Sequence, residues 1–342
     1  MNIKPNEICF LNYLDGLEHT NNLPDYWKYN YGINPNIVSK KLLNNGLIEF
    51  KLDIERNISN LTIPQLKEIL RSNNLSVGGK KSELISRILG NVDINTLEQK
   101  FSKKRFCLTF KGKELIENNY LFIINQKENY NFNDEDIFNI YKLYSNENNK
   151  DKLIKLFHYV IKKDIKNKDY SNLDLRILQL YNFYLKIDMF DEALFYYIVS
   201  FKLHLFNFQT YNNEVYLNDV KYINFDDTFL RKLKNVISLT NYDENKLYNI
   251  IISEDITTNL PFHYFSNEDC YKILIDLLHN KPFNILNYNI NKPTSNSKEY
   301  IYYDFNDTEL FNNSSIKVSS TNNHSKGLIN NILNTFFKKG KH

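Results

Sequence analysis

Two lysines that follow a pair of glycines are the residues whose types and spacing best suit a chemical role. Gly78 and Gly79 interrupt helix propensity, and Lys80 and Lys81 begin the helix that is predicted to follow. The first turn of a helix carries free N–H groups and the positive end of the helix dipole, so an anion is stabilised there. The chemistry predicted for these residues is the binding of a phosphate group.

Two short amphipathic helices are predicted to position these lysines. Thr62 and Gln65 have the spacing of a capping box at the start of the first helix. Pro64 falls in the first turn, where a missing N–H donor costs nothing. Apolar residues recur at helical spacing in both helices, at Leu66, Ile69 and Leu70 and at Leu84, Ile85, Ile88 and Leu89.

The spacing of residues 61–88 resembles the SAP domain, a helix–extended loop–helix module that typically binds DNA. The residues that carry the resemblance are Leu61, Thr62, Ile63, Leu66, Lys67, Leu70, Leu75, Gly79, Lys81, Leu84, Arg87 and Ile88. The resemblance implies contacts to the backbone of duplex DNA, mostly without base readout, from Lys67, Arg71, Lys80, Lys81 and Arg87. SAP-like helical pairs also serve as protein-docking modules, which is the alternative.

The charge distribution favours DNA. Between Arg56 and Lys113 the chain has twelve Lys and Arg residues against four Asp and Glu residues, a local balance of +8, whereas the whole chain carries +3. A second basic cluster around Lys103, Lys104 and Arg105 lies in this stretch, and we add these three residues to the predicted DNA-binding set. Such a footprint predicts binding that depends strongly on salt and little on sequence.

The flanks of the helical pair resemble the two halves of a winged helix. Residues 36–43 predict a helix that stops at Asn45–Gly46 before a short apolar strand. An extended segment from Arg105 turns into a second helix, with the closing pattern Leu-Thr-x-Lys-Gly-x-x-Leu-Ile at 108–116. A winged-helix-like domain would then span 1–120 with the SAP insertion at 58–92, because hairpin tips tolerate long insertions. Three unrelated small elements are the alternative.

The helix at 36–43 would be the recognition helix of such a domain. Its polar side is predicted to carry Asn36, Ser39 and Lys40. Because this helix has few charges, we expect modest base reading and no defined operator.

Composition and length indicate a mainly α-helical protein with two or three domains. The 342 residues include only 9 Gly and 7 Pro, and the abundance of Asn, Lys, Ile and Tyr is typical of an AT-rich genome. Cys9, Cys107 and Cys270 are isolated, which indicates a reducing compartment. No apolar run approaches the length of a membrane span, so we expect a cytoplasmic protein of a bacterium or infected host cell without integral membrane association.

Residues 130–285 predict a helical domain. The segment 174–205 resembles a tetratricopeptide repeat (TPR), with Ile187–Asp188 at the turn between its helices and Ala193 as the small contact residue. Tyr181 and Leu205 replace the glycine and proline that are usual in this repeat. An irregular helical bundle is the alternative. A TPR-like domain implies a protein partner or self-association, with Arg176, Gln179 and Asn182 as groove candidates.

Two further segments are predicted after this domain. Residues 286–325 are mostly polar and rich in Ser, Thr and Asn, which indicates a linker. Residues 326–339 predict an amphipathic helix with one apolar stripe, suited to docking on its own bundle or on a partner, and less suited to a membrane surface.

The sequence contains no recognisable catalytic or cofactor-binding motif. A phosphate-binding loop, a dinucleotide fingerprint, a nucleophile elbow and a zinc-protease motif are all absent. The seven histidines have no metal-ligand spacing. We therefore expect no enzyme, no cofactor and no metal.

Two functional hypotheses follow from the sequence. The first is a non-catalytic protein that grips duplex DNA while its helical domain recruits a partner or dimerises. The layout as a whole resembles SAP-domain proteins encoded by phages and mobile elements of low-GC bacteria. The second hypothesis is a protein-interaction adaptor in which the SAP-like pair is structural.

Overall fold

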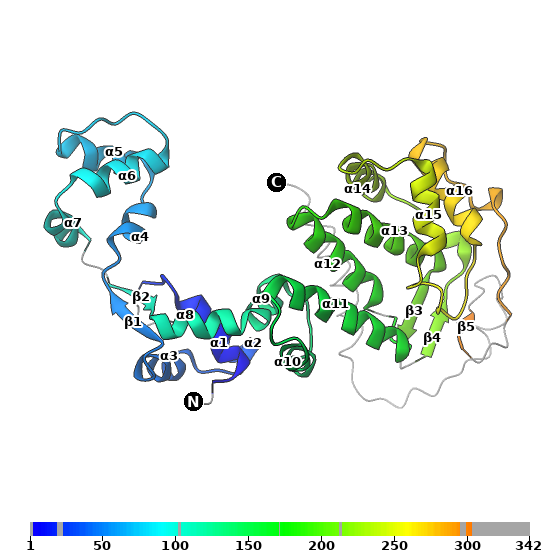
Figure 1. The fold of residues 1–342 in the computed structure, drawn as a ribbon, viewed down its shortest axis with the longest axis horizontal. Coiled ribbons are helices and arrows are strands. Elements are labelled where there is room, and N and C mark those ends of the chain that lie inside the picture. The colour runs from blue at the N-terminus through cyan, green and yellow to red at the C-terminus, as the bar shows by residue number, and fades with distance from the viewer. Residues whose placement is uncertain are drawn as a thin grey trace, which may run out of the picture.

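The computed structural model describes residues 3–18, 23–101, 104–170, 172–211, 214–294 and 299–302. Within these residues the fold has sixteen α-helices, two short 3-10 helices and five short strands. The prediction of a mainly helical protein is confirmed. Figure 1 shows the segment between β1 (Ile48–Lys51) and β2 (Arg105–Leu108) projecting from this hairpin, on the side away from the C-terminal helices.

The N-terminal part packs its helices around one hairpin. Leu42, Leu47 and Ile48 are buried in the same core as Leu11 and Phe106, so the hairpin and the first helices pack together. Strands β1 and β2 are antiparallel, with Ile48 opposite Leu108. The elements are α1 (Pro5–Leu14), α2 (Tyr26–Tyr31), α3 (Pro35–Asn44), β1 (Ile48–Lys51), β2 (Arg105–Leu108), α8 (Phe110–Asn118) and α9 (Tyr120–Glu128).

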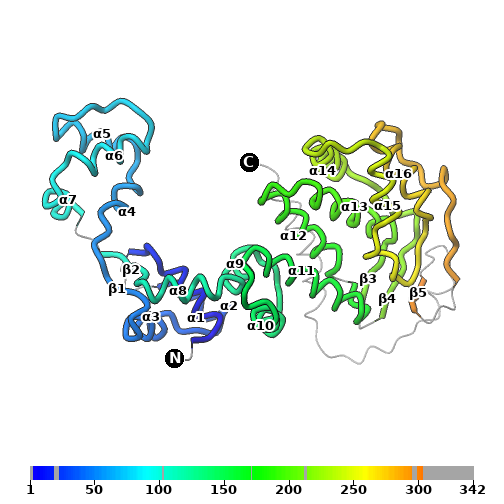
Figure 2. Tube along the Cα trace, in the orientation of Figure 1, coloured from blue at the N-terminus to red at the C-terminus, as the bar shows by residue number. Residues whose placement is uncertain are grey.

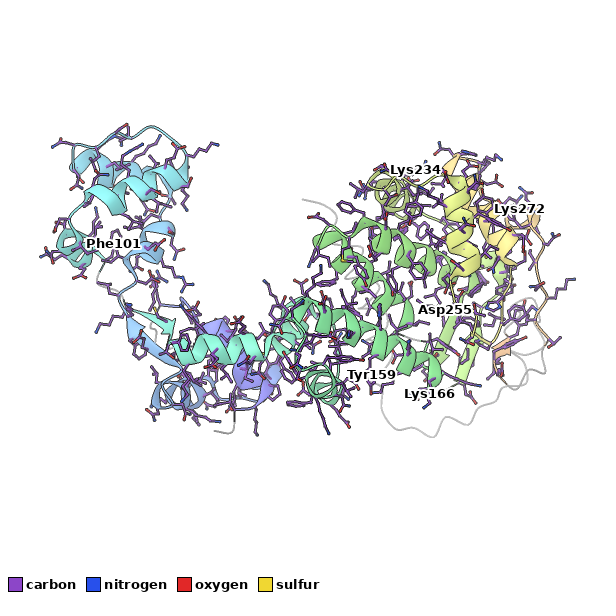
Figure 3. The ribbon with its side chains drawn as sticks, viewed as in Figure 1. Phe101, Tyr159, Lys166, Lys234, Asp255 and Lys272 are labelled. Carbon is purple, nitrogen blue, oxygen red and sulfur yellow. The ribbon has the colours of Figure 1, made fainter. Side chains whose placement is uncertain are left out.

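The insertion between β1 and β2 has a hydrophobic core of its own. Its nine buried apolar residues form a cluster separate from the core of the remaining chain. Phe101, labelled in Figure 3, packs against this small core where the chain leaves the insertion. The helices are α4 (Ile54–Ser59), α5 (Ile63–Ser72), α6 (Lys81–Asn91) and α7 (Ile94–Lys100). The insertion is therefore a small folded unit carried on the hairpin.

Thr109 and Gly112 fasten α8 to the loop before β1. The Thr109 amide donates to the Leu47 carbonyl at 3.1 Å, and the Thr109 hydroxyl donates to the Gly46 carbonyl at 2.7 Å. The same hydroxyl caps α8 by accepting from the Gly112 amide. A Cβ at Gly112 would lie 2.0 Å from the Leu47 carbonyl oxygen, so only glycine permits this approach. These contacts explain the Thr-x-Lys-Gly part of the closing pattern.

The buried side chains of the C-terminal part belong to the same large cluster as those of the N-terminal part. The helices are α10 (Asp134–Leu143), α11 (Asn149–Lys166), α12 (Leu173–Lys186), α13 (Phe190–Phe206), α14 (Asp227–Ser238), α15 (Glu244–Ser253) and α16 (Asn267–Leu278). The strands are β3 (Phe208–Tyr211), β4 (Glu214–Leu217) and β5 (Ile301–Tyr302), and the 3-10 helices are η1 (Val220–Tyr222) and η2 (Ile285–Asn287). Helices α10 and α12 pack against the long helix α11, and α12, α14 and α15 pack against the long helix α13.

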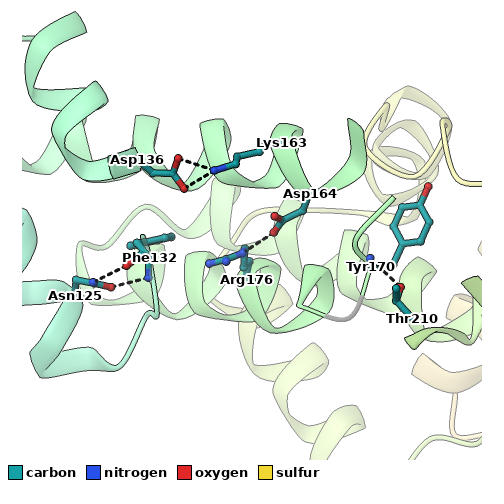
Figure 4. A network of polar contacts seen from close by, with 8 residues as sticks. All are labelled: Asn125, Phe132, Asp136, Lys163, Asp164, Tyr170, Arg176 and Thr210. Carbon is teal, nitrogen blue, oxygen red and sulfur yellow. Dashed lines mark hydrogen bonds and ion pairs between the residues drawn. The ribbon is translucent and has the colours of Figure 1, made fainter. Parts of the chain in front are cut away.

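Half-buried ion pairs hold α11 between its neighbours. Lys163 of α11 donates to Asp136 of α10 at 2.8 Å (Figure 4). Arg176 of α12 donates to Asp164 of α11 at 2.6 Å. The Arg176 guanidinium thus has a local role in joining α12 to α11, and its predicted place in a groove for a partner stays a prediction.

Helices α12 and α13 form the hairpin that was predicted as a repeat unit. The turn lies at the predicted position, with Asp188 in the left-handed region at φ +56°. Ala193 is fully buried, and Tyr181 contacts Tyr197 across the two helices with ring centroids 4.8 Å apart. Gln179 donates its side-chain amide to the Asn129 carbonyl, while Asn182 is exposed. Membership of the TPR family stays a prediction.

The segment 286–325 was predicted as a polar linker, and its described residues, 286–294 and 299–302, include some that pack against the C-terminal part, while the linker as a whole stays a prediction. Tyr300 is buried, and Ile301 pairs with Tyr216 in a parallel arrangement that adds β5 to β4. Tyr288 donates to Asp276 of α16 at 3.0 Å. Aromatic side chains within this polar stretch thus bury apolar surface, and the strand β5 completes a small sheet with β3 and β4. The predicted helix at 326–339 lies outside the described residues.

A half-buried histidine, His158, gives the C-terminal part a predicted dependence on pH. The Nε2 atom of His158 lies 2.7 Å from the Tyr196 hydroxyl, and burial, with help from Lys162, lowers the pKa of His158. A lowered folded-state pKa means that the unfolded chain binds more protons below about pH 6.5, so this contribution to stability falls as pH decreases. When the pH is lowered from about 7.5 to about 5.5, we expect the melting temperature of His158→Gln to fall less than that of the wild type. Glutamine keeps a hydrogen-bond acceptor for the Tyr196 hydroxyl but does not titrate in this range.

Melting curves at the two pH values measure this difference directly. A wild type and a His158→Gln variant whose melting temperatures shift equally with pH would contradict the assignment to His158. Any titration of surface carboxylates is common to both proteins and cancels in the comparison.

Candidate nucleic-acid interface

The first helix of the insertion begins as the sequence predicts. The Gln65 side chain accepts from the Thr62 amide at 2.8 Å and from the Thr62 hydroxyl at 2.9 Å. Pro64 lies in the first turn of α5. Leu66, Ile69 and the neighbouring Leu70 are buried against α6, so the polar side of α5 faces solvent. The capped start and the buried face fix the orientation of α5 on the insertion core.

The loop at 73–80 is held against the helix pair along its length. In Figures 1 and 2 it arches over the pair before α6 begins. Asn74 adopts a left-handed conformation at φ +55°, and the Leu75 amide donates to the Leu70 carbonyl at 2.8 Å. Leu75 and Val77 pack against the insertion core. The loop is therefore extended and is anchored to the insertion core at Leu75 and Val77.

Arg87 fixes the same loop from the opposite side. Its guanidinium donates to the Ser76 carbonyl at 2.7 Å and to the Gly78 carbonyl at 2.9 Å. The two acceptors lie just before the lysines at the start of α6. Arg87, predicted as a DNA contact, therefore has a local role in shaping the loop that presents Lys80.

We expect Arg87→Ala to loosen the loop by about 1 kcal/mol, the usual scale of lost hydrogen bonds to a charged group at a partly exposed site. Amide hydrogen exchange in residues 73–80 should then accelerate by about fivefold. Both hydrogen bonds come from one nitrogen, Nη1, so Arg87→Lys, whose ammonium can also donate to two carbonyls, should keep part of the protection. Wild-type protection in Arg87→Ala would instead mean that Leu75 and Val77 alone hold the loop.

The start of α6 is partly filled by a carboxylate of the chain itself. Gly79 has φ +119°, and a Cβ there would lie 2.3 Å from the Glu83 carboxylate. That carboxylate accepts from the Lys80 amide at 3.3 Å. Glu83 thus occupies part of the positive end of the helix that was predicted to attract an anion. A phosphate at this end would be held by the Lys80 and Lys81 side chains more than by backbone amides.

The remaining basic residues of the helix pair are available to a ligand. Arg71, Lys80 and Lys81 are exposed, and Lys67 is half-buried. None of these four forms an ion pair with a residue that the structure describes. Lys67 and Arg71 are four residues apart on α5 and share one side of that helix. The insertion thus offers four cations for contacts to phosphates.

The second predicted cluster contributes less than its sequence suggests. Arg105 is only 8% exposed and donates to the Asn57 side chain at 2.6 Å, to the Gly16 carbonyl at 2.8 Å and to Glu18 at 2.9 Å. These buried contacts tie the insertion to the N-terminal domain, and breaking them to reach DNA would leave polar groups unpaired. This burial argues against the predicted contact between Arg105 and DNA. Lys104 is exposed, and Lys103 lies outside the described residues.

The side of the insertion that faces the hairpin is acidic. A cleft of about 870 Å³ separates the two, and Arg56 on its wall pairs with Asp15 at 3.1 Å. Five carboxylates line this cleft, at Asp15, Glu49, Asp53, Glu55 and Glu98, against three cations, at Lys51, Arg56 and Lys113. Because the balance of charge is negative here, DNA is expected on the outer side of the insertion, where the loop and the start of α6 lie.

The predicted recognition helix corresponds to α3 and is less polar than expected. Asn36 and Lys40 are exposed, but Ser39 is buried and donates its hydroxyl to the Asn36 carbonyl. Ile37 is 66% exposed in its place. Ser39 is therefore corrected from the polar side to the packed side of α3.

The roles of Glu83 at the start of α6 and of Arg87 in holding the loop were not predicted from the sequence. Glu83 lies three residues after the Lys80 cap position, which is the capping-box spacing already recognised at Thr62 and Gln65. From that spacing one could have predicted that the Glu83 side chain accepts a hydrogen bond from a free backbone amide at the start of α6. The role of Arg87 has no comparable local signal, because its acceptors are backbone carbonyls nine and eleven residues away.

Other kinds of site are not found in the part of the chain that the structure describes. No group of three or more His, Cys, Asp or Glu side chains there could hold a metal ion. Among the described helices, none combines the length and the apolar character that crossing a membrane requires.

Comparison with known proteins identifies the insertion. The family of the SAP domain matches residues 57–93, which include α5, the anchored loop and α6. No curated protein matches the chain. The prediction of a SAP domain is confirmed, and this domain suggests that the protein binds nucleic acid.

Proposed function

We propose that this protein is a non-catalytic DNA-binding protein that grips duplex DNA mainly through the phosphate backbone. The contacts come from Lys67, Arg71, Lys80 and Lys81 of the SAP domain. The observation that carries the proposal is the exposure of these four cations, without ion-pair partners among the described residues, on a segment that matches the SAP family. Phosphate contacts of this kind give affinity without sequence information.

The N-terminal domain is proposed to be winged-helix-like, with the SAP domain at the tip of its wing. The pairing of Ile48 with Leu108 across the insertion supports this proposal, as do the contacts of Thr109 and Gly112 with Leu47. Helix α3 then supplies Asn36 and Lys40 as minor contacts. With one exposed lysine and one exposed amide on this side, α3 adds little sequence preference.

The C-terminal domain is proposed to be a TPR-like platform for a protein partner or for self-association. The packed α12–α13 hairpin supports this role. Composition supports an origin in a phage or mobile element of a low-GC bacterium, since Gly and Pro are scarce and Asn and Lys abundant. An adaptor whose SAP domain only stabilises the N-terminal part is the second candidate, because Glu83 already occupies part of the expected anion site.

A salt series with duplex DNA separates the two candidates. We expect fluorescence anisotropy to show binding at low salt, with a slope of about −3 to −4 in a plot of log K against log salt concentration, since each phosphate contact contributes about −0.9. Two duplexes of unrelated sequence should bind alike. A protein that binds neither duplex at low salt would leave the adaptor as the better account.

A further inference from the structure

A pocket of about 610 Å³ lies in the C-terminal domain, far along the chain from the SAP domain. One side of it is the face of α11 that carries residues 158, 161–162 and 165–166. The other sides are α13 and the loop after α15. Figure 3 labels Lys166 near the end of α11 and Asp255 at the foot of α15. We call this cavity the α11 pocket.

The floor of the α11 pocket is apolar and uncharged. It includes Ile161, Phe195 and Tyr196, of which Ile161 and Tyr196 are buried. The Tyr196 hydroxyl is satisfied by its hydrogen bond with His158, and burial lowers the pKa of His158, which keeps the imidazole neutral near pH 7. Such a floor suits the flat face of an aromatic or heteroaromatic ring.

The two rims of the pocket carry opposite chemistry. Lys162, Lys166 and Lys168 follow the α11 side and are exposed. Lys168 pairs with Glu299 at 4.0 Å. Lys162 and Lys166 lie one helical turn apart and form no ion pair with any described residue, so they repel each other until an anion lies between them. The opposite rim presents the Asp255 carboxylate and the Asn259 amide, which are also exposed.

We propose that the α11 pocket binds a nucleoside monophosphate whose base carries an exocyclic amino group. The phosphate lies on Lys162 and Lys166, the base covers the apolar floor, and the amino group donates to Asp255. A fatty acid would satisfy the lysines but would leave Asp255 beside an alkyl chain. Inorganic phosphate would leave the floor uncovered. The pocket volume lies within the usual range for a small ligand.

Calorimetric titration of the full-length protein with adenosine monophosphate tests the proposal. We expect a Kd in the range of about 10 μM to 1 mM. Adenosine, which lacks the phosphate, and inorganic phosphate, which lacks the base, should each bind at least about tenfold more weakly. Equal affinity for adenosine and its monophosphate, or for inorganic phosphate and the monophosphate, would overturn the proposal, as would the absence of binding.

Two variants test the assigned contacts. Lys162→Ala/Lys166→Ala should weaken binding of adenosine monophosphate by at least about tenfold, whereas Lys142→Ala/Lys150→Ala, with the same change of charge on exposed positions outside the pocket, should not. Inosine monophosphate replaces the amino donor with a carbonyl, so wild type should prefer the adenosine compound. Asp255→Asn should lose that preference because an amide both donates and accepts.

A competition experiment distinguishes a free nucleotide from the end of a DNA or RNA strand as the ligand. If the pocket binds strand ends, a single strand with a 5′-phosphorylated adenosine at its end should displace adenosine monophosphate. If the pocket binds only free nucleotides, the strand should not displace it. The chemistry of recognition is shared by both sources. Unchanged affinity in Lys162→Ala/Lys166→Ala would overturn the site, whatever the result of duplex binding by the SAP domain.

Discussion

Replacing Lys80 and Lys81 with alanine is expected to weaken binding of duplex DNA by about 60-fold at about 0.1 M salt. Each lysine is expected to make one phosphate contact, and each contact adds about −0.9 to the slope of log K against log salt concentration. The slope should therefore become shallower by about 2, and the affinities of variant and wild type should converge toward 1 M salt. Fluorescence anisotropy across a salt series measures both quantities.

A matched variant separates this local effect from a general loss of charge. Lys142→Ala/Lys150→Ala removes two exposed lysines from the C-terminal domain and should leave duplex affinity within about twofold of wild type. If both double variants lost affinity equally, DNA would be attracted by the net charge of the chain, and Lys80 and Lys81 would have no special place in binding.

Leu84→Ala is expected to unfold the SAP insertion while the other domains stay folded. Leu84 is fully buried in the insertion core, and truncating such a leucine costs about 2–5 kcal/mol. The insertion has only nine buried apolar residues to supply its stability, and they form a cluster separate from the rest of the chain. Duplex binding should be lost together with the insertion.

Hydrogen exchange followed by mass spectrometry measures this outcome. Peptides from residues 54–100 should lose protection in Leu84→Ala, while peptides from α12 and α13 keep theirs. Leu89→Ala is the control, because Leu89 belongs to the same helix but lies outside the insertion core and is 37% exposed. Loss of protection throughout the chain would show that the insertion and the other domains fold as one cooperative unit.

Local patterns allowed the SAP helices to be predicted, because their signals lie within a few residues. The cap at Thr62, the glycine at Gly79 and the turn at Ile187–Asp188 each depend on neighbours three or four positions away. The same patterns cannot show which basic residues are free. Lys104 and Arg105 are adjacent and alike in sequence, yet Arg105 is buried by partners 48 to 89 positions away.

The small C-terminal sheet could not be predicted for a related reason. Strand β5 has two residues, Ile301 and Tyr302, and it pairs with Tyr216 and Leu217 more than eighty positions earlier. A two-residue strand has no period, so its pairing depends on tertiary packing alone. Burial of Tyr300 against the large core is what holds this segment in place.

Hydrogen exchange with and without DNA shows whether the SAP domain is the part of the protein that binds duplex DNA. The full-length protein is compared with and without a duplex of about 20 base pairs at low salt, where backbone contacts are strongest. The account predicts new protection in peptides that cover residues 73–91, which contain the anchored loop and the start of α6. Protection confined to the C-terminal helices, with residues 73–91 unchanged by saturating duplex, would contradict it.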